Sequence, residues 1–333
     1  MRRIKAVQIG LGHDHAPAPF VTMPYLSDLF ELCGLVIPSE EEGKYDRKKG
    51  AVKLPLLTLS EALENEEIEA VFIETEEKYL TKYSVLSLKA GKHVYMDKPG
   101  GSDHEEFLEA IRLAKEKGKV LHMGYMYRYN PVISDLMKKI REGYLGEIFS
   151  VEAQMNGISP PTEEKRRWLS GIDGGMMYFL GCHMVDLVIS ILGEPEEIIP
   201  HNIATGHSGE GVNDYGLAVF KYKNAQAIVK SSAAEYGGFP RRQLVVCGSK
   251  GTAEVKPLEM HSGGVAHHTT VCYYMNPVWC DKGETLVSEE YDRYKALIES
   301  FGLEILGEIE NPYTAEYEIA VHKATLKAAG IIK

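Results

Sequence analysis

Lys98 combines a reactive side chain with a rigid setting, and its context favours chemistry more than that of any other residue. It follows the short apolar segment His93–Asp97 and is itself followed by Pro99. A strand on one side and the fixed φ of proline on the other hold the lysine in place, and proline lacks the N–H that would extend the strand. Such a lysine can provide a positioned charge or an acid. The alternative is a solvated lysine at a strand end, and the residues upstream argue against it.

The segments before Lys98 alternate between strand-like and helix-like patterns. Three apolar runs of strand length precede it, at residues 4–9, 30–37 and 70–75. Helix-length intervals separate them, which predicts a doubly wound parallel sheet with its ligands outside the carboxyl ends of the strands. Gly10, Thr75 and Lys98 all stand at such ends. We therefore expect these three residues to face one crevice.

The first of these strand ends carries a glycine motif that matches a dinucleotide fingerprint in part. The fingerprint reads G-x-G-x-x-G, and this chain has Gly10 and Gly12 but a histidine, His15, at the third position. The first two glycines permit the tight turn and the close approach of backbone to pyrophosphate, whereas the third serves helix packing. The bulky histidine at the third position leaves the motif weak on its own.

The end of the second strand decides how an adenosine ribose could be held. Ile37 stands where an acidic residue is usual, and Pro38, Ser39 and Glu40 follow, so only Ser39 or Glu40 could reach a ribose hydroxyl. Basic residues that could bind a 2′-phosphate come somewhat later, at Lys44, Arg47, Lys48 and Lys49. The sequence therefore leaves NAD and NADP open as the cofactor.

Two adjacent carboxylates, Glu76 and Glu77, follow Thr75 at the end of the third apolar run. Carboxylates beside a pyrophosphate are electrostatically unfavourable unless they face solvent or accept hydrogen bonds from ribose hydroxyls. Most pyrophosphate contacts nevertheless come from backbone N–H groups and a helix N-terminus. The pair argues against ordinary cofactor binding without abolishing it.

The run Ala90–Pro99 reads AGKHVYMDKP and is similar to the strand AGKHVxxEKP of the glucose-fructose oxidoreductase and inositol dehydrogenase family. Further matches extend over most of the chain, at GYMYRYNP (124–131), LGEI (145–148), GG (174–175), GCHMVD (181–186), LGEP (192–195) and residues 248–254. The resemblance implies an α/β protein with an N-terminal Rossmann domain and a C-terminal domain built on a large open, mostly antiparallel sheet. It also implies hydride transfer between NAD(P) and a hydroxyl or carbonyl, commonly on a sugar or polyol.

Catalysis in that family rests on the lysine of the strand and on an Asp-x-x-x-His pair on a helix. The resemblance assigns these roles to Lys98 and His183, but the aspartate four residues before the histidine is Phe179 here. Residues at i and i+4 share a helix face, so an apolar ring takes the place of the carboxylate. Asp186, three residues after His183, could supply it instead, and Tyr178 offers a phenol. A buried His and Asp that only stabilise the helix are the alternative.

These arguments together assign two sets of ligand contacts. The residues expected at the cofactor are Gly10, Gly12, His13, Asp14, His15, Pro38, Ser39, Thr75, Glu76, Asp97, Lys98 and Arg128. Those expected at the substrate are Tyr127, Trp168 and His183. A metal site at His13 and His15 is not expected, since two histidines this close on a turn rarely converge on an ion without distant ligands.

A change in the pattern of predicted strands and helices near residues 120–130 divides the chain into two domains. We expect a Rossmann domain over residues 1–123 and a substrate and oligomerisation domain over residues 124–333, with the last helix, 314–329, able to pack back on the first domain. Strands dominate residues 197–287, where few helices are available to cover a sheet. An apolar face should therefore meet a second subunit in a homodimer or homotetramer. Residues expected on that face are Leu217, Val219, Ile228, Leu244 and Val246, with Tyr273, Tyr274 and Trp279 as aromatic anchors.

Composition limits the partners. A net charge of −11 excludes a nucleic-acid face of the usual basic kind, and no segment reaches the roughly 20 apolar residues of a membrane span. The five cysteines form no CxxC pair, which favours reduced thiols in the cytoplasm. Two functions remain: an NAD(P)-dependent oxidoreductase acting on a polyhydroxylated small molecule, and a fold relative without redox chemistry. The second would be a ligand-binding or regulatory protein, or a non-redox enzyme that uses Lys98 and His183.

Overall fold

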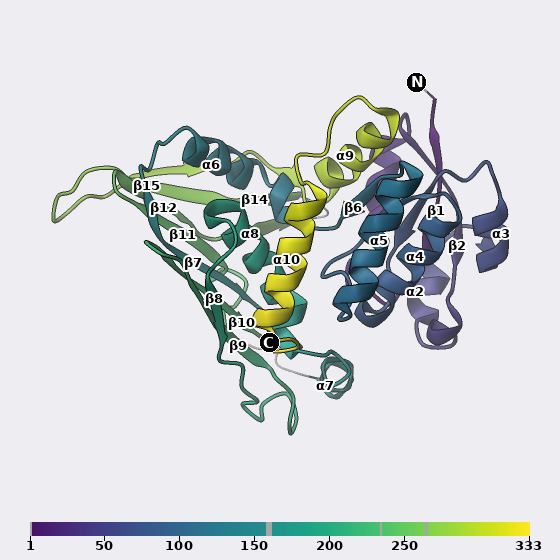
Figure 1. Cartoon of the computed structure of the whole chain (residues 1–333), viewed down its shortest axis with the longest axis horizontal. Coiled ribbons are helices and arrows are strands. Elements are labelled where there is room, and N and C mark those ends of the chain that lie inside the picture. Colours follow the sequence, from purple (N-terminus) through teal and green to yellow (C-terminus); the bar gives the residue numbers. More distant parts are fainter. Residues whose placement is uncertain (1, 158–161, 234, 264–265) are drawn as a thin grey trace. The chain divides into compact units, whose positions relative to one another are not determined.

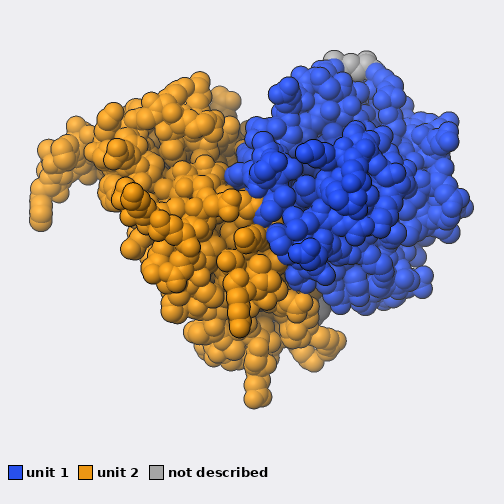
Figure 2. All heavy atoms as spheres, in the orientation of Figure 1, with its two compact units in different colours: residues 1–126, 294–319 blue, residues 127–293, 320–333 orange. Residues whose placement is uncertain are grey.

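The computed structural model describes residues 2–157, 162–233, 235–263 and 266–333. The chain folds into two compact units, which Figure 2 shows in different colours. The first unit comprises Met1–Met126 and Tyr294–Ile319, and the second comprises Tyr127–Arg293 and Ala320–Lys333. These units are defined by which residues pack together. The predicted boundary between a cofactor domain and a substrate domain, between residues 123 and 124, stays a prediction.

The first unit contains a six-stranded parallel sheet with the strand order β3-β2-β1-β4-β5-β6. Its strands are β1 (Ile4–Ile9), β2 (Phe30–Val36), β3 (Leu56–Leu57), β4 (Ala70–Ile73), β5 (His93–Met96) and β6 (Leu121–Met123). This order reverses direction next to β1, which is the switch point of a doubly wound Rossmann sheet. The predicted fold of the N-terminal part is confirmed.

Helices of the first unit connect these parallel strands, as the crossovers of a parallel sheet require. These are α1 (Ala18–Thr22), α2 (Asp46–Ala51), α3 (Leu59–Glu64), α4 (Leu80–Lys89) and α5 (His104–Lys117). Helix α9 (Lys295–Leu306), which follows β17 (Tyr291–Asp292), also belongs to the first unit. Strand β4 is buried along its whole length, because a sheet covered on both faces needs apolar side chains on both. Asp103 caps α5 by accepting the N–H groups of Glu105 and Glu106, and Gly118 ends it in the left-handed conformation.

The second unit is built on an eight-stranded sheet with the order β16-β15-β12-β11-β7-β10-β9-β8. Its strands are β7 (Ile148–Asn156), β8 (Glu197–Pro200), β9 (Tyr215–Lys221), β10 (Gln226–Ser232), β11 (Gln243–Gly248), β12 (Gly251–Val255), β15 (Thr270–Tyr274) and β16 (Glu284–Val287). Only β7 and β10 pair in parallel, so the large, mostly antiparallel sheet is confirmed. A small sheet contains β13 (Met260–Gly263), β14 (Ala266–His268) and β17 (Tyr291–Asp292).

The register of this sheet corrects one sequence-based expectation. Val219 pairs with Ile228, and both lie on the more open face, where Ile228 is 42% exposed. Leu244 and Val246 lie on the opposite face and are fully buried. The prediction that these residues form one apolar face together with Leu217 is therefore wrong. Alternation shows that each strand has two faces, but the register between strands decides which faces coincide.

Among the described residues, four helices belong wholly or partly to the second unit: α6 (Pro131–Arg141), α7 (Glu163–Leu169), α8 (Cys182–Leu192) and α10 (Ala315–Ala328). Helix α8 packs on β7 and β10 and covers the buried face of the sheet (Figure 1). A turn of π-helix, Met177–Gly181, leads directly into α8. None of the helices in the described part of the chain has both the length and the apolar character needed to cross a membrane.

Candidate functional site

The glycine turn after β1 packs so tightly that it requires glycine at two positions. Gly10 has φ +91°, and a Cβ there would lie 2.6–2.7 Å from side-chain and backbone atoms of Thr75. A Cβ on Gly12 would lie 2.4 Å from the backbone nitrogen of Glu76. Real Cβ contacts are never this short, so any larger residue would push the ends of β1 and β4 apart. The predicted meeting of Gly10 and Thr75 is thus present.

The N–H groups of this turn hold a carboxylate. Glu41 is 1% exposed and accepts hydrogen bonds from the N–H of Leu11 at 2.7 Å and from the N–H of Glu76 at 2.8 Å. Burial raises the pKa of Glu41, while the N–H groups of Leu11, Glu76 and Gly12 lower it. In Rossmann domains the N–H groups of this turn hold the cofactor's pyrophosphate. The turn in this chain is therefore able to bind an anion, and Glu41 supplies one.

Sequence reasoning missed Glu41, since it considered only Ser39 and Glu40 at this corner. Ser39 is exposed, and Glu40 points elsewhere, with an ion pair to Lys82 and a hydrogen bond of 2.6 Å from the Tyr83 hydroxyl. The available signal was a second acidic residue, Glu41, directly after Glu40. Its direction depends on the 3-10 turn Ser39–Glu41, which the sequence pattern does not show.

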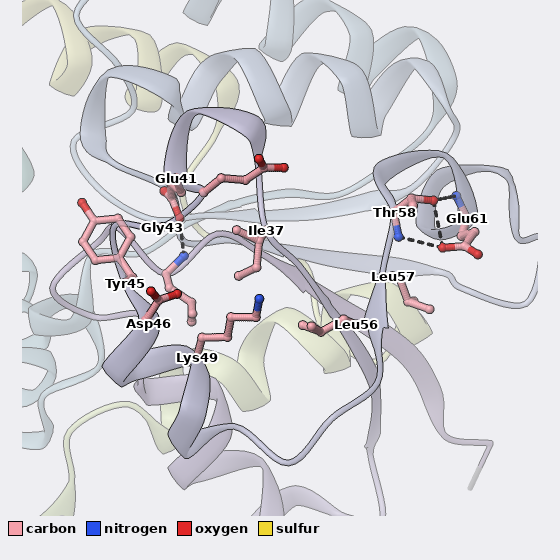
Figure 3. A pocket seen from close by; sticks show the side chains of 12 residues that line it. Ile37, Glu41, Gly43, Tyr45, Asp46, Lys49, Leu56, Leu57, Thr58 and Glu61 are labelled. Atoms are coloured by element: carbon pink, nitrogen blue, oxygen red, sulfur yellow. Dashed lines mark hydrogen bonds between the residues drawn. The ribbon is translucent and has the colours of Figure 1, made fainter.

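A cavity of about 490 Å³ opens beside this corner, at the carboxyl end of β2 (Figure 3). Ile37, Tyr45 and Leu57 provide apolar lining, and Glu41 and Lys49 contribute charges of opposite sign. The carboxyl end of the second strand is where a doubly wound fold takes the adenosine of a dinucleotide. The cavity and the anion-binding glycine turn fit NAD(P). A bound pyrophosphate would displace the Glu41 carboxylate from the N–H groups.

The carboxylate of Glu76 is balanced by basic neighbours. Its oxygen atoms lie 2.8 Å from Lys44 Nζ and 3.3 Å from Lys78 Nζ, and Tyr45 donates a hydrogen bond of 3.0 Å. Burial alone would raise the pKa of Glu76, but Lys44 and Tyr45 lower it below its usual value. Local ion pairs therefore compensate the negative charge of Glu76, which was expected to disfavour a pyrophosphate. The sequence argument did not consider this arrangement.

Lys98 follows β5 and is fully buried. Three carboxylates lie around it, namely Glu74, Glu77 and Asp97, and Lys98 lowers the pKa of all three. Burial acts in the opposite direction and prevails: it raises the pKa of Glu77 to about 7, and it raises those of Glu74 and Asp97 above their usual values. Lys98 thus sits in a buried acidic cluster, as a positioned charge would.

The two histidines after the glycine turn belong to the same cluster. His13 is fully buried, and its Nε2 lies 3.0 Å from the Lys98 carbonyl oxygen. His15 Nδ1 lies 3.2 Å from both carboxylate oxygens of Asp97. Asp14, between the two histidines, is exposed. The sequence placed all three residues at the cofactor, and the structure brings His13 and His15, but not Asp14, to Lys98.

In the second unit, His183 lies on α8 and is buried. Its ring meets the ring of Tyr127 edge to face, with centroids 5.4 Å apart. The Tyr127 hydroxyl donates a hydrogen bond of 2.7 Å to Glu259. Burial and the negative charge of Glu259 raise the pKa of Tyr127. The predicted substrate residues His183 and Tyr127 are therefore neighbours.

Asp186 was expected to orient His183, but the structure gives it another partner. The guanidinium of Arg128 donates to both Asp186 carboxylate oxygens, at 2.7–3.1 Å, and both side chains are buried. This bidentate pair fixes the start of the second unit to α8. The expected contact of Arg128 with the cofactor and the expected support of His183 by Asp186 both stay predictions.

The segment before His183 departs from a regular helix. Phe179 lies in the π-helical turn and packs edge to face on Trp168, with ring centroids 4.6 Å apart. Tyr178, in the same turn, is buried. Single π-turns inside helices occur often at functional sites, because they re-aim the side chains that follow. The aromatic contact explains how an apolar ring is accommodated where the family has a carboxylate.

The doubly wound sheet, its anion-binding turn and the buried lysine define an NAD(P)-dependent oxidoreductase of the Rossmann class. Comparison with family models then shows that the chain belongs to the GFO/IDH/MocA family. Residues 5–125 match the model described as the oxidoreductase family with an NAD-binding Rossmann fold, and residues 133–254 match the GFO/IDH/MocA C-terminal domain. The family resemblance inferred from the sequence is confirmed.

Curated relatives include enzymes of more than one reaction type. The chain is 27% identical over 246 residues to scyllo-inositol 2-dehydrogenase (NADP(+)) of Bacillus subtilis (strain 168), covering 73% of this chain and 67% of that protein. It is 26% identical over 243 residues to 2,7-anhydro-N-acetylneuraminate hydratase of Escherichia coli (strain K12), covering 68% of this chain and 64% of that protein. Matches to two further Escherichia coli oxidoreductases cover 54% and 47% of those proteins.

Solved structures share the fold over almost the entire chain. KijD10, a 3-ketoreductase from Actinomadura kijaniata in complex with TDP-benzene and NADP, superimposes with a TM-score of 0.76 at 19% identity, covering 98% of this chain and 96% of that one. Aldose-aldose oxidoreductase from Caulobacter crescentus gives a TM-score of 0.76 at 19% identity, covering 99% and 98%. At this identity the likeness establishes the fold alone.

Proposed function

We propose that this protein transfers a hydride between NAD(P) and a sugar, a polyol or a related polyhydroxylated small molecule. The observation that carries the proposal is the buried Lys98 at the end of β5, in the same unit as a glycine turn that already holds an anion. The names of the relatives, an inositol dehydrogenase and a 3-ketoreductase among them, support a polyhydroxylated substrate.

The chain's own residues have separate tasks in this reaction. NAD(P), when bound, would accept the hydride from a carbinol carbon or supply it to a carbonyl carbon. Lys98 donates a hydrogen bond to the reacting oxygen and stabilises the negative charge that develops there. His183 takes up the hydroxyl proton in the oxidation and returns it in the reduction, a task suited to imidazole near neutral pH. Tyr127 and Trp168 contact the substrate.

For the cofactor, Gly10, Gly12 and Thr75 would shape the turn, and the cavity beside Ile37 would take the adenosine. A contact of Pro38 and Ser39 with the cofactor is likewise part of the proposal. His13, His15, Glu76 and Asp97 belong to the wall behind the turn, and a direct contact of these residues or of Arg128 with the cofactor stays a proposal. The choice between NAD and NADP rests on whether Lys49, in the lining of the cavity, binds a 2′-phosphate.

Titration of the protein with NADH and NADPH, followed by fluorescence, tests cofactor binding directly. Substrate oxidation is then followed by the absorbance of the reduced cofactor, with inositols, hexoses and hexitols as a panel. Lys98→Ala should bind cofactor and abolish turnover, whereas the control Lys117→Ala, an exposed lysine at the end of α5, should keep full activity. His183→Asn should lower the rate and flatten its pH profile. Normal turnover in Lys98→Ala would refute the assignment.

A reaction without net redox change is the second candidate, because one relative is named as a hydratase. Such an enzyme would convert its substrate without net formation of NAD(P)H. Product analysis by mass spectrometry separates the two: a change of two mass units indicates oxidation or reduction, and a change of eighteen indicates hydration or dehydration.

We also propose a cytoplasmic protein that forms a homodimer or homotetramer through the sheet of the second unit. Light scattering tests the assembly, and a particle of 37.1 kDa would exclude it.

A further inference from the structure

The cluster around Lys98 contains three side chains whose ligand atoms converge. One ligand atom each of His13, His15 and Asp97 lies within 4.8 Å of the others, and all three side chains are buried. His13 Nδ1 lies 3.4 Å from Asp97 Oδ2, and His15 Nδ1 lies 3.2 Å from Asp97 Oδ1. Ligands around a tetrahedral zinc ion, at about 2.0–2.1 Å from it, are separated by about 3.4 Å. These two separations are therefore already those of ligands that share one ion.

The hydrogen bonds of His13 set the tautomer that a metal ligand needs. The Lys98 carbonyl oxygen can only accept, so His13 Nε2, 3.0 Å away, carries the proton. Nδ1 then has its one lone pair, which accepts a long hydrogen bond of 3.1 Å from the His15 N–H and lies 3.4 Å from Asp97 Oδ2. An ion bound to Nδ1 would replace that hydrogen bond. Metal-bound histidines are oriented in the same way, by donation from the second ring nitrogen to a carbonyl or carboxylate.

An independent observation comes from Glu74, which is 1% exposed and approaches His13 Nδ1 to 3.7 Å through Oε2. Among the described residues, no hydrogen-bond donor reaches either Glu74 carboxylate oxygen, and its neighbour is a second carboxylate, that of Asp97. Glu77 Oε1, 3.9 Å from His13 Nε2, likewise has no donor. Buried carboxylates that no donor reaches are unfavourable, and they share a proton, pair with a cation or coordinate a metal.

The charge of the cluster points to the kind of ion. Metal ligands bind in their deprotonated forms. If all three ionise to bind a metal, Glu74, Glu77 and Asp97 carry one negative charge each against the single positive charge of Lys98, and a divalent cation would neutralise the difference. Two imidazoles and carboxylate oxygens suit zinc and its transition-metal neighbours better than Ca²⁺ or Mg²⁺, which prefer oxygen ligands alone.

We propose that His13, His15 and Asp97, with Glu74 as the fourth ligand, bind a divalent transition-metal ion of the zinc class. The sequence argument against a metal rested on the absence of distant ligands for the two histidines. The fold supplies them, because the ends of β4 and β5 bring Glu74 and Asp97 to the glycine turn. The site belongs to the first unit, and metal binding can be measured without any assay of hydride transfer.

The test uses the full chain without an affinity tag, stripped with EDTA and then incubated with ZnSO₄. After removal of free metal, mass spectrometry of the ions should find one zinc per chain. Competition with a chromogenic chelator gives the affinity. His15→Ala and Asp97→Asn should each weaken zinc binding by at least about 100-fold, by loss of a direct ligand. The control His207→Ala, on an exposed loop of the second unit, should bind zinc like the unchanged protein.

Because Asp97 is buried and its substitution could prevent folding, the unchanged protein provides a second measurement. Substitution with Co²⁺ should give visible absorption typical of four-coordinate cobalt, and X-ray absorption of the zinc form should show two imidazole ligands at about 2.0 Å. Three results would overturn the proposal: no retained zinc, an unchanged affinity in a folded His15→Ala variant, or a zinc spectrum without imidazole.

Discussion

Glu41 is expected to compete with the cofactor for the glycine turn, and its removal should tighten cofactor binding. Its carboxylate accepts the N–H groups of Leu11 and Glu76, at 2.7 and 2.8 Å. A pyrophosphate that uses the same turn has to displace it. The perturbation is Glu41→Ala, and the matched control is Glu42→Ala, an exposed neighbour that lines the same cavity but is not bonded to the turn.

The magnitude follows from these two hydrogen bonds and from the burial of the carboxylate. Hydrogen bonds to a charged group contribute about 1.5–3 kcal/mol each, so displacing Glu41 costs on the order of 3–6 kcal/mol. Return of the carboxylate to water offsets several kcal/mol of that cost, since burial raises the pKa of Glu41 and so disfavours the charge. A net gain of about 1.4–2.8 kcal/mol remains for the variant, which corresponds to a 10- to 100-fold lower Kd.

Calorimetric titration with NADH and NADPH measures this change for the unchanged protein and both variants. Inorganic pyrophosphate should follow the same order and bind Glu41→Ala measurably better than the control. Weaker binding of the dinucleotides to Glu41→Ala would refute the reasoning, because it would show that Glu41 holds the cofactor, as an acidic residue after the second strand does when it binds the ribose. Equal changes in both variants would attribute the effect to the charge of the cavity.

Three further expectations concern stability. Burial raises the Glu77 pKa to about 7, so the protonated form favours the fold below pH 4.5 and this contribution, on the order of 3 kcal/mol, is lost as the pH rises through 7. Urea unfolding of the metal-free protein should show that loss, and Glu77→Gln should remove it. Asp186→Asn removes the carboxylate charge of the buried bidentate pair with the Arg128 guanidinium and should lower the free energy of unfolding by about 3–5 kcal/mol; a loss below 1 kcal/mol would mean that other groups or water compensate for the carboxylate. Gly10→Ala should lower the melting temperature far more than Gly43→Ala, because both have positive φ but only the first meets neighbouring atoms; equal shifts would leave backbone strain as the only cause.

Local pattern was sufficient for the parallel sheet of the first unit, whereas the large sheet of the second unit was expected from the family resemblance. The spacing of apolar runs predicts the parallel sheet, because each strand and each helix has to bury its own side chains whatever its neighbours are. The proline after Lys98 and the tight glycine turn are equally local, since both act through backbone torsions. These features place Gly10, Thr75 and Lys98 at strand ends.

Contacts between distant segments were decided only by the tertiary structure. Glu41 reaches the glycine turn through a change of direction after β2, and Asp186 pairs with Arg128, fifty-eight residues earlier in the chain. Leu244 lies on the covered face because of its register with β7, which alternation along one strand cannot specify.

The buried cluster shows the same division most clearly. His13 and His15 are adjacent to the glycine turn in sequence, but Glu74 and Asp97 come from two other strands that meet them at one sheet edge. Which strand ends the fold brings together determines the partners of a side chain. How completely the fold excludes water determines its charge state. Residue types along the chain therefore determined which groups were available, and the packing determined which of them became one site.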